Sequence, residues 1–244
     1  MHIIKLNAID STQLFLKRYI ATQTAPIPDT VAWALQQTDG IGQYGTSWRV
    51  EEGKNLTFSM LHNVKEVLAS DYFLLNMAVS LAIIEVLEAL PIPHLKIKWP
   101  NDILSSDKKI GGVLIENGIR SGEIVRSVIG IGINVNQTDF EHLPRASSLK
   151  NSTGKEFDLE TLLYHLTASL QEHLARIGTG TFANLYENYQ KYLYRIDQKS
   201  MFCTPDKTGF SGIIRGVTPS GLLQIELEKG NVATYNLKEI EMLY

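Results

Sequence analysis

The stretch Lys96-Ile97-Lys98-Trp99-Pro100-Asn101-Asp102 is where the fold prediction starts. Apolar and basic residues alternate up to Trp99, as they do in a half-buried strand. Pro100 ends that strand, because proline has no N–H to donate to a sheet. A lysine, an indole, an amide and a carboxylate are thus delivered together to a strand end, which fits a reaction centre. The alternative is an ordinary turn, because Pro-Asn-Asp is also common turn chemistry.

Composition restricts the classes of protein to which the chain can belong. Its 244 residues, 44% of them hydrophobic, suffice for a full core and one small additional domain. The 23 basic and 26 acidic residues give a net charge of −3, so no broad basic surface for nucleic acid is expected. The single cysteine, Cys203, excludes an internal disulfide and a zinc site made of cysteines. A cytoplasmic location is therefore the expectation.

No export or membrane segment is expected either. Residues 1–6 become polar too soon for a signal peptide. The most apolar run, residues 74–90, is interrupted by polar side chains at roughly helical spacing, which predicts a buried amphipathic helix with Asp71 as its cap. The six histidines are scattered, without the spacing of metal ligands.

Polar residues precede the first predicted helix. A short strand at Ile3–Leu6 leads into Asp10, Ser11 and Thr12, after which apolar residues recur at helical spacing to Tyr19. Asp10 or Ser11 would cap this helix and leave hydroxyl groups and first-turn amides at its positive end. Both a ligand-binding helix start and a plain cap fit this pattern.

Three glycines, Gly40, Gly42 and Gly45, follow the next predicted strand, Thr30–Gln36. Their spacing matches the G-x-G-x-x-G dinucleotide pattern, which must open a helix. Here the residues after the loop have no helical period and lead into another strand at Leu56–Leu61, so we reject a dinucleotide fold. A P-loop is rejected too, because no Gly-Lys pair follows. A flexible glycine loop whose amides can enclose an anion remains.

Glycine also alternates with isoleucine in the pair of strands predicted at Gly111–Glu116 and Arg126–Asn136. Gly130 and Gly132 share one face of the sheet. Since neither has a side chain, either another body or the long helix can lie on the backbone there.

The rest of the chain predicts helices followed by short strands. A polar loop at Pro144–Gly154 precedes two helices, Asp158–Ile177 and Phe182–Leu193, whose apolar residues are three or four apart. After Asp197, short strands separated by glycine turns predict a small all-β domain, most simply a barrel.

Together these segments resemble the biotin protein ligases, in particular the monofunctional biotin–[acetyl-CoA-carboxylase] ligases. The resemblance covers nearly the whole chain and implies an α+β fold, a mixed β-sheet flanked by helices as in the class II synthetase-like biotin/lipoate ligases. It also implies a catalytic domain at residues 1–195 and a small SH3-like β-barrel at residues 196–244. The matching residues, in the family's order and spacing, are Asp10–Thr12, Gln37–Trp48, Lys98–Asp102, Lys109–Glu116 and Gly130–Asn134.

The resemblance implies an ATP-dependent ligase that first activates biotin as biotinyl-5′-AMP. It would then transfer biotin to a lysine of a biotin carboxyl carrier domain of acetyl-CoA carboxylase or a related carboxylase. ATP and biotin are the implied substrates, and Mg²⁺ accompanies ATP. Repressor-type members carry an amino-terminal DNA-binding domain, for which the early Ser11 leaves no room, so neither DNA nor a membrane is an expected partner. The oligomeric state is left open, a homodimer included.

By the same resemblance Lys98 is the catalytic residue, since a positioned ammonium stabilises the charge that forms on the phosphate. Asp102 would help to hold the magnesium ion or, as we favour, anchor Lys98, and no other metal ligand is expected. The implied biotin-binding residues are Ser11, Thr12, Gln37, Gly40, Ile41, Lys98, Gly112 and Gly132. The implied adenylate-binding residues are Gly42, Gln43, Tyr44, Gly45, Trp48, Asn101 and Asn134.

One departure from the family lies in the glycine loop, which is often rich in arginine. Here Ile41, Gln43, Tyr44 and Thr46 occupy those places, so the loop brings little charge of its own to an adenylate. Two other functions are weighed: a lipoate ligase or octanoyltransferase on a related fold, and a non-catalytic binding module. A lipoate ligase or octanoyltransferase would require a long apolar tunnel and a different glycine signature. A non-catalytic binding module would have no use for a lysine at position 98.

Overall fold

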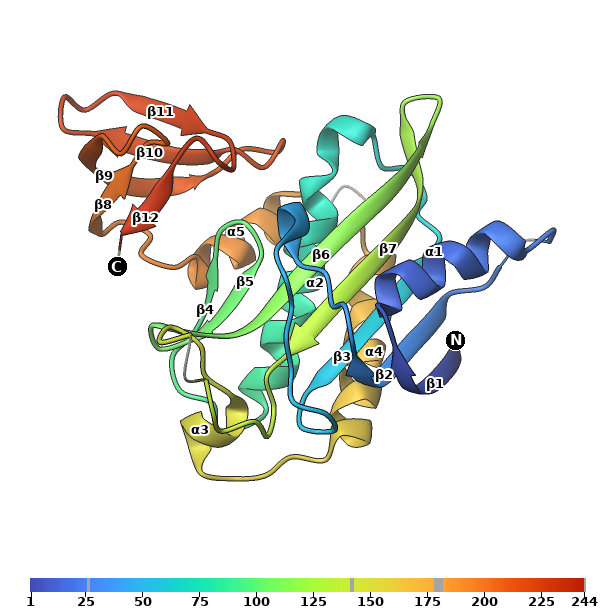
Figure 1. The fold of residues 1–244 in the computed structure, drawn as a ribbon. Coiled ribbons are helices and arrows are strands. Elements are labelled where there is room, and N and C mark those ends of the chain that lie inside the picture. Colours follow the sequence, from blue (N-terminus) through green and yellow to red (C-terminus); the bar gives the residue numbers. More distant parts are fainter. Residues whose placement is uncertain (26, 141–142, 178–181, 244) are drawn as a thin grey trace.

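The chain forms two β-sheets, and the computed structural model in Figure 1 describes residues 1–25, 27–140, 143–177 and 182–243. The side chains of Tyr44 and Phe182 are outside this description. Within the described residues the larger sheet has seven strands: β1 (His2–Ile9), β2 (Thr30–Gln37), β3 (Leu56–His62), β4 (Leu95–Lys98), β5 (Asp102–Ser105), β6 (Lys108–Arg120) and β7 (Glu123–Ile133). Their order across the sheet is β1-β2-β3-β7-β6-β5-β4. β1 and β2 are parallel and the other neighbours antiparallel, which confirms the predicted mixed sheet.

Helices cover both faces of this sheet (Figure 1). On one face, α2 (Phe73–Glu88) packs against β4 and β6, and α4 (Leu159–Ala175) and α5 (Phe182–Tyr192) pack against α2. On the other face, α1 (Thr12–Thr22) packs against β2, β3 and β7. The alternation along β7 explains this division, because Ile129, Ile131 and Ile133 join the α2 core while the glycines between them point to the opposite face, Gly130 towards Gln13 of α1 and Gly132 towards Trp48.

α2 differs from the amphipathic helix that the sequence predicted. Twelve of its 16 residues are buried, because the sheet and two other helices surround it. It begins at Phe73, and the predicted cap Asp71 instead belongs to a 3₁₀ turn, η2 (Ala69–Asp71). By length and composition alone, residues 69–88 are long and apolar enough to cross a membrane, but 61% of their most apolar window is buried inside the structure.

β4 ends at Lys98, as the alternation and Pro100 predicted. Lys98 pairs with Asp102 at the start of β5, so the residues between them form the turn. The strand end and the turn are therefore both present. Trp99 donates from its indole Nε1 to the carbonyl oxygen of Gly221 at 2.9 Å, which ties this strand end to the second sheet.

The second sheet confirms the predicted all-β domain at the carboxyl end. Its strands are β8 (Lys199–Cys203), β9 (Gly209–Val217), β10 (Leu223–Leu227), β11 (Val232–Tyr235) and β12 (Glu241–Leu243), all antiparallel in the order β11-β10-β9-β8-β12. In the part of the chain that the structure describes, no pairing joins β11 to β12, so hydrogen bonds do not close this sheet into a full barrel. The division of the chain between residues 195 and 196 stays a prediction.

The segment Pro144–Gly154, expected to be a polar loop, contains a short helix, α3 (Leu149–Thr153). Ser148 caps it by accepting a hydrogen bond from the backbone N of Asn151 at 3.0 Å. Gly154 ends it with a φ of 74°, the left-handed conformation that glycine adopts readily.

Candidate active site

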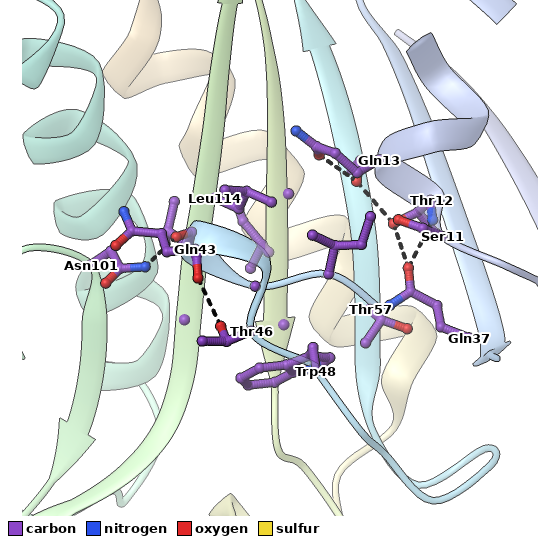
Figure 2. Close-up of a pocket in the computed structure, with 18 of the residues that line it drawn as sticks. Ser11, Thr12, Gln13, Gln37, Gln43, Thr46, Trp48, Thr57, Asn101 and Leu114 are labelled. Atoms are coloured by element: carbon purple, nitrogen blue, oxygen red, sulfur yellow. Dashed lines mark hydrogen bonds between the residues drawn. The ribbon is translucent and has the colours of Figure 1, made fainter. Parts of the chain in front are cut away.

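A cavity of about 210 Å³ lies on the α1 face of the larger sheet. Its walls come from the start of α1, from β3, β6 and β7, and from residues 41–48, which cross in front of the sheet (Figures 1 and 2). The structure thus brings together segments that lie far apart in the sequence. The predicted site residues that line this cavity are Ser11, Thr12, Gln37, Ile41, Gly42, Gln43, Trp48, Asn101, Asp102, Gly112 and Gly132.

Hydroxyl and amide groups gather at the α1 end of the cavity (Figure 2). Ser11 is the N-cap of α1 and is only 1% exposed, so it both caps the helix and lines the cavity. Gln37, the last residue of β2, accepts with Oε1 from the backbone N of Thr12 at 2.8 Å and from its Oγ1 at 3.0 Å. Because the backbone N is a donor, the other amide atom of Gln37 is its nitrogen, which lies beside Gly40.

Asp10 holds the start of α1 from outside the cavity. Its carboxylate accepts from the backbone N of Ser11 at 2.7 Å and from two guanidinium nitrogens of Arg18, each at 2.8 Å. The hydrogen bond from Arg18, reinforced by the Ser11 amide, lowers the pKa of Asp10 to about 2. Asp10 is therefore ionised near neutral pH and keeps the Ser11 backbone in place.

The glycine loop is a narrow hairpin over the cavity. The backbone N of Trp48 donates to the Gly40 oxygen at 2.8 Å, and that of Gly42 donates to the Thr46 oxygen at 2.6 Å. A short 3₁₀ turn, η1 (Gln43–Gly45), makes the tip. The hairpin places Trp48 against the sheet, where its indole is part of the cavity wall (Figure 2).

The two glycines of β7 make room for side chains of the chain itself. A Cβ on Gly132 would lie 2.4 Å from Cε2 of Trp48, and a Cβ on Gly130 would lie 2.7 Å from Oε1 of Gln13. Side chains of α1 and of the hairpin therefore lie on these glycines, and the long helix α2, one of the two alternatives from the sequence, does not. Gly112 faces Gly132 across the β6–β7 ladder and leaves space for Lys109 and Trp48.

The lysine of the cavity is Lys109, in β6. Its Nζ lies 2.6 Å from Oδ1 of Asp102 and 5.6 Å from the ring centre of Trp48. Lys98, expected at this place, instead lines a second cavity between the end of β4 and the second sheet, together with Tyr194. Asp102 contacts Lys109 and pairs with Lys98 in the β4–β5 ladder, and the anchoring of Lys98 by Asp102 stays a prediction.

The remaining adenylate-side and hairpin residues predicted from the sequence differ in their relation to the cavity. Gly40 and Gly45 belong to the hairpin but not to the cavity wall, and the side chain of Tyr44 is outside the described part. Asn101 lines the wall and donates to the Val113 oxygen at 2.6 Å. Asn134, expected on the adenylate side, instead donates to the Ser147 oxygen at 2.9 Å and holds the loop before α3.

Sequence reasoning missed several polar residues of the wall. Thr57 and Ser59 alternate along β3 and lie opposite Gly132 and Gly130 in the register with β7. Two hydroxyl residues in an otherwise apolar strand, facing glycines, are a signal that was present in the sequence. The wall residues that were not among the predicted site residues are Gln13, Thr46, Ser47, Thr57, Phe58, Ser59, Lys109, Val113, Leu114, Gly130 and Ile131. Among the described residues, no group of three His, Cys, Asp or Glu side chains is placed to hold a metal ion.

Residues 6–134, which contribute every wall of this cavity, match the biotin/lipoate A/B protein ligase family. The chain belongs to this family. Within the biotin/lipoate ligases it is 28% identical to the bifunctional ligase/repressor BirA of Bacillus spizizenii, over 96% of this chain and 72% of that protein. It is 29% identical to the biotin–[acetyl-CoA-carboxylase] ligase of Paracoccus denitrificans, over 83% of this chain and 87% of that protein.

The fold leads to the same family. The structure of biotin protein ligase from Aquifex aeolicus in complex with biotin and ATP is similar to this chain, with a TM-score of 0.81 and 27% identity. The similarity covers 99% of this chain and 98% of that one, so it includes both sheets. The family resemblance and the fold class inferred from the sequence are confirmed.

Proposed function

We propose that this chain is an ATP-dependent biotin protein ligase. The observation that carries the proposal is one cavity whose wall includes both a cluster of hydroxyl and amide groups and a lysine, under a single hairpin. Membership of the biotin/lipoate ligases and the similarity to named biotin ligases over most of the chain support it.

The ureido ring of biotin matches the α1 end of the cavity. A ureido group has one carbonyl acceptor and two N–H donors, and such a group needs partners of both kinds in an otherwise apolar slot. The amide nitrogen of Gln37 is a donor for the carbonyl, and the hydroxyl oxygens of Ser11 and Thr12 are acceptors for N–H groups. We assign these three residues to the ureido ring.

In the first reaction an oxygen of the biotin carboxylate attacks the α-phosphorus of ATP. A P–O bond to that oxygen forms, the bond to pyrophosphate breaks, and biotinyl-5′-AMP results. Negative charge builds up on the phosphate oxygens, so an ammonium held beside them lowers the barrier. We assign this role to Lys109, which lines the cavity. Lys98 lines the adjoining cavity, which shares Gln43, Asn101 and Asp102 with the first, and stays the alternative.

Mg²⁺ is proposed to enter with ATP. Asp102 is the carboxylate among the described wall residues, and Lys109 already contacts it. Because Mg²⁺ commonly combines phosphate oxygens with one or two carboxylates, the phosphates would supply most of its ligands and Asp102 at most one.

In the second reaction the amine of an acceptor lysine attacks the carbonyl carbon of the mixed anhydride. A C–N bond forms, the C–O bond breaks and AMP leaves. Gly42, Gln43, Trp48 and Asn101 line the cavity and are our proposed adenylate-binding residues. By covering the adenylate, the hairpin would exclude water from an anhydride that water hydrolyses. The proposed acceptor is a biotin carboxyl carrier domain.

Lipoate is the competing substrate, because the family includes lipoate ligases. A thermal-shift measurement with ATP should show stabilisation by biotin and none by lipoate at equal concentrations. Stabilisation by lipoate alone would overturn the substrate assignment. The decisive assay is transfer of labelled biotin to a carrier domain in the presence of ATP.

A further inference from the structure

Glu116, in β6, connects the surface with the polar end of the cavity although it does not line the cavity. Its side chain is 43% exposed, and its two carboxylate oxygens contact two residues of α1. Oε1 accepts from Nζ of Lys17 at 2.9 Å, and Oε2 accepts from Nε2 of Gln13 at 2.9 Å. Gln13 is 3% exposed and is part of the cavity wall.

These contacts fix the orientation of the Gln13 amide. Its Nε2 also donates to the backbone oxygen of Val128 at 2.9 Å, so both neighbours of this atom are acceptors. The atom is therefore the nitrogen, both of its protons are used, and Oε1 faces Ser59. The hydroxyl of Ser59 donates to Oε1 at 3.1 Å (Figure 2).

The orientation of Gln13 determines what Thr12 offers to a ligand. Ser59 donates its single hydroxyl proton to Oε1 of Gln13. It therefore cannot also donate to Oγ1 of Thr12, which lies 2.9 Å from its own oxygen. Thr12 also has one proton, for which Ser59 and Oε1 of Gln37 compete. Whichever of them receives it, lone pairs of the Thr12 oxygen remain able to accept a ligand N–H.

We propose that Glu116 is a positioning residue for biotin. The Glu116 carboxylate accepts a hydrogen bond from the second N–H of Gln13. Through Gln13 and Ser59, this contact leaves the Thr12 hydroxyl oxygen available to accept a hydrogen bond from a ureido N–H. This inference rests on the proposed function. Without an acceptor at position 116, a buried N–H of Gln13 loses its partner, and the amide turns to find another. Ser59 is then released and donates to Thr12, which occupies one of the two lone pairs that the Thr12 oxygen otherwise offers to the ureido N–H.

Three variants of the full chain separate this role from a simple ion pair between β6 and α1. Glu116→Met has similar length but no acceptor, Glu116→Gln keeps one oxygen for Gln13, and Lys17→Met removes only the ion pair.

Formation of biotinyl-AMP is measured while biotin and ATP are varied separately. For Glu116→Met we expect about a tenfold rise in the KM for biotin, the equivalent of one lost hydrogen bond, with kcat and the KM for ATP within about twofold of the parent. Glu116→Gln and Lys17→Met should both remain within about threefold of the parent in every constant.

A second background tests whether the effect passes through Ser59. Ser59→Ala removes the hydroxyl that would donate to Thr12, so adding Glu116→Met in that background should raise the KM for biotin by less than about twofold. Equal KM changes in Glu116→Met, Glu116→Gln and Lys17→Met would show an ion-pair tether and overturn the proposal. So would an unchanged KM in Glu116→Met, or a rise just as large when Glu116→Met is combined with Ser59→Ala. If the parent itself makes no biotinyl-AMP, the proposed function fails, which is a different result from any of these.

Discussion

Replacing Lys109 by methionine tests the chemistry of the cavity most sharply. The variant keeps most of the side-chain volume over Gly112 and beside Trp48 but removes the ammonium. At about 4 Å from a phosphate oxygen and an effective dielectric constant of about 20, one ammonium contributes about 4 kcal/mol to charge stabilisation. The Asp102 carboxylate, 2.6 Å from Nζ, offsets part of this contribution. We therefore expect a loss at the lower end of the usual range for such contacts, about a hundredfold in the rate of biotinyl-AMP formation.

The assay is release of pyrophosphate from labelled ATP in the presence of biotin, before any acceptor protein is added. Lys98→Met is the matched control, because Lys98 lies in the neighbouring cavity, and we expect it to lose less than about tenfold. Asp102→Asn should lose about tenfold, since Lys109 would then lack the carboxylate that orients it. A Lys109→Met enzyme within about threefold of the parent would refute the reasoning, and so would a larger loss in Lys98→Met than in Lys109→Met.

Three further predictions concern biotin, the hairpin and the helix start. Gln37→Ala should weaken biotin binding by about 1–3 kcal/mol in calorimetry with ATP binding nearly unchanged, and an equal loss of both ligands would indicate misfolding instead. Biotin, alone or with ATP, should protect residues 39–54 from hydrogen exchange and proteolysis more than ATP alone does, and equal protection in the empty protein would exclude gating by the hairpin. Because the pKa of Asp10 is about 2, below its ordinary value of 3.8, its contribution to stability is present above pH 3.8 and disappears as the pH falls through 2. Urea denaturation should therefore show Asp10→Asn less stable than the parent at pH 7, with the difference shrinking towards pH 2, and a difference independent of pH would contradict this.

Local patterns in the sequence were enough to predict most elements of the fold. Period-two alternation located β4 and the glycine face of β7, and the polar residues before α1 located its cap at Ser11. These features depend on neighbours along the chain, so the sequence displays them directly. α2 was predicted less well, because its polar residues Asn76 and Ser80 are buried and bond to each other, which no periodicity reveals.

The candidate site depended on tertiary placement, and there the prediction was less complete. Lys98 and Lys109 both stand in segments that match the family, and only the pairing of β4, β5 and β6 shows that Lys109 lines this cavity while Lys98 lines the adjoining one. Asn134 also lies in a matching segment, but its amide is used to hold the Ser147 backbone. The wall residues of β3 were missed because their exposure to a cavity follows from the glycines opposite them on β7, a relation that exists only in the folded sheet.

Transfer of labelled biotin is the most direct test of the proposed function. The full chain is incubated with ATP, Mg²⁺, labelled biotin and a biotin carboxyl carrier domain, beside a carrier whose acceptor lysine is replaced by arginine. We expect label on the intact carrier only, dependent on ATP and strongly reduced by Lys109→Met. Absence of label from the intact carrier when biotinyl-5′-AMP is also not formed would contradict the assignment as a biotin protein ligase.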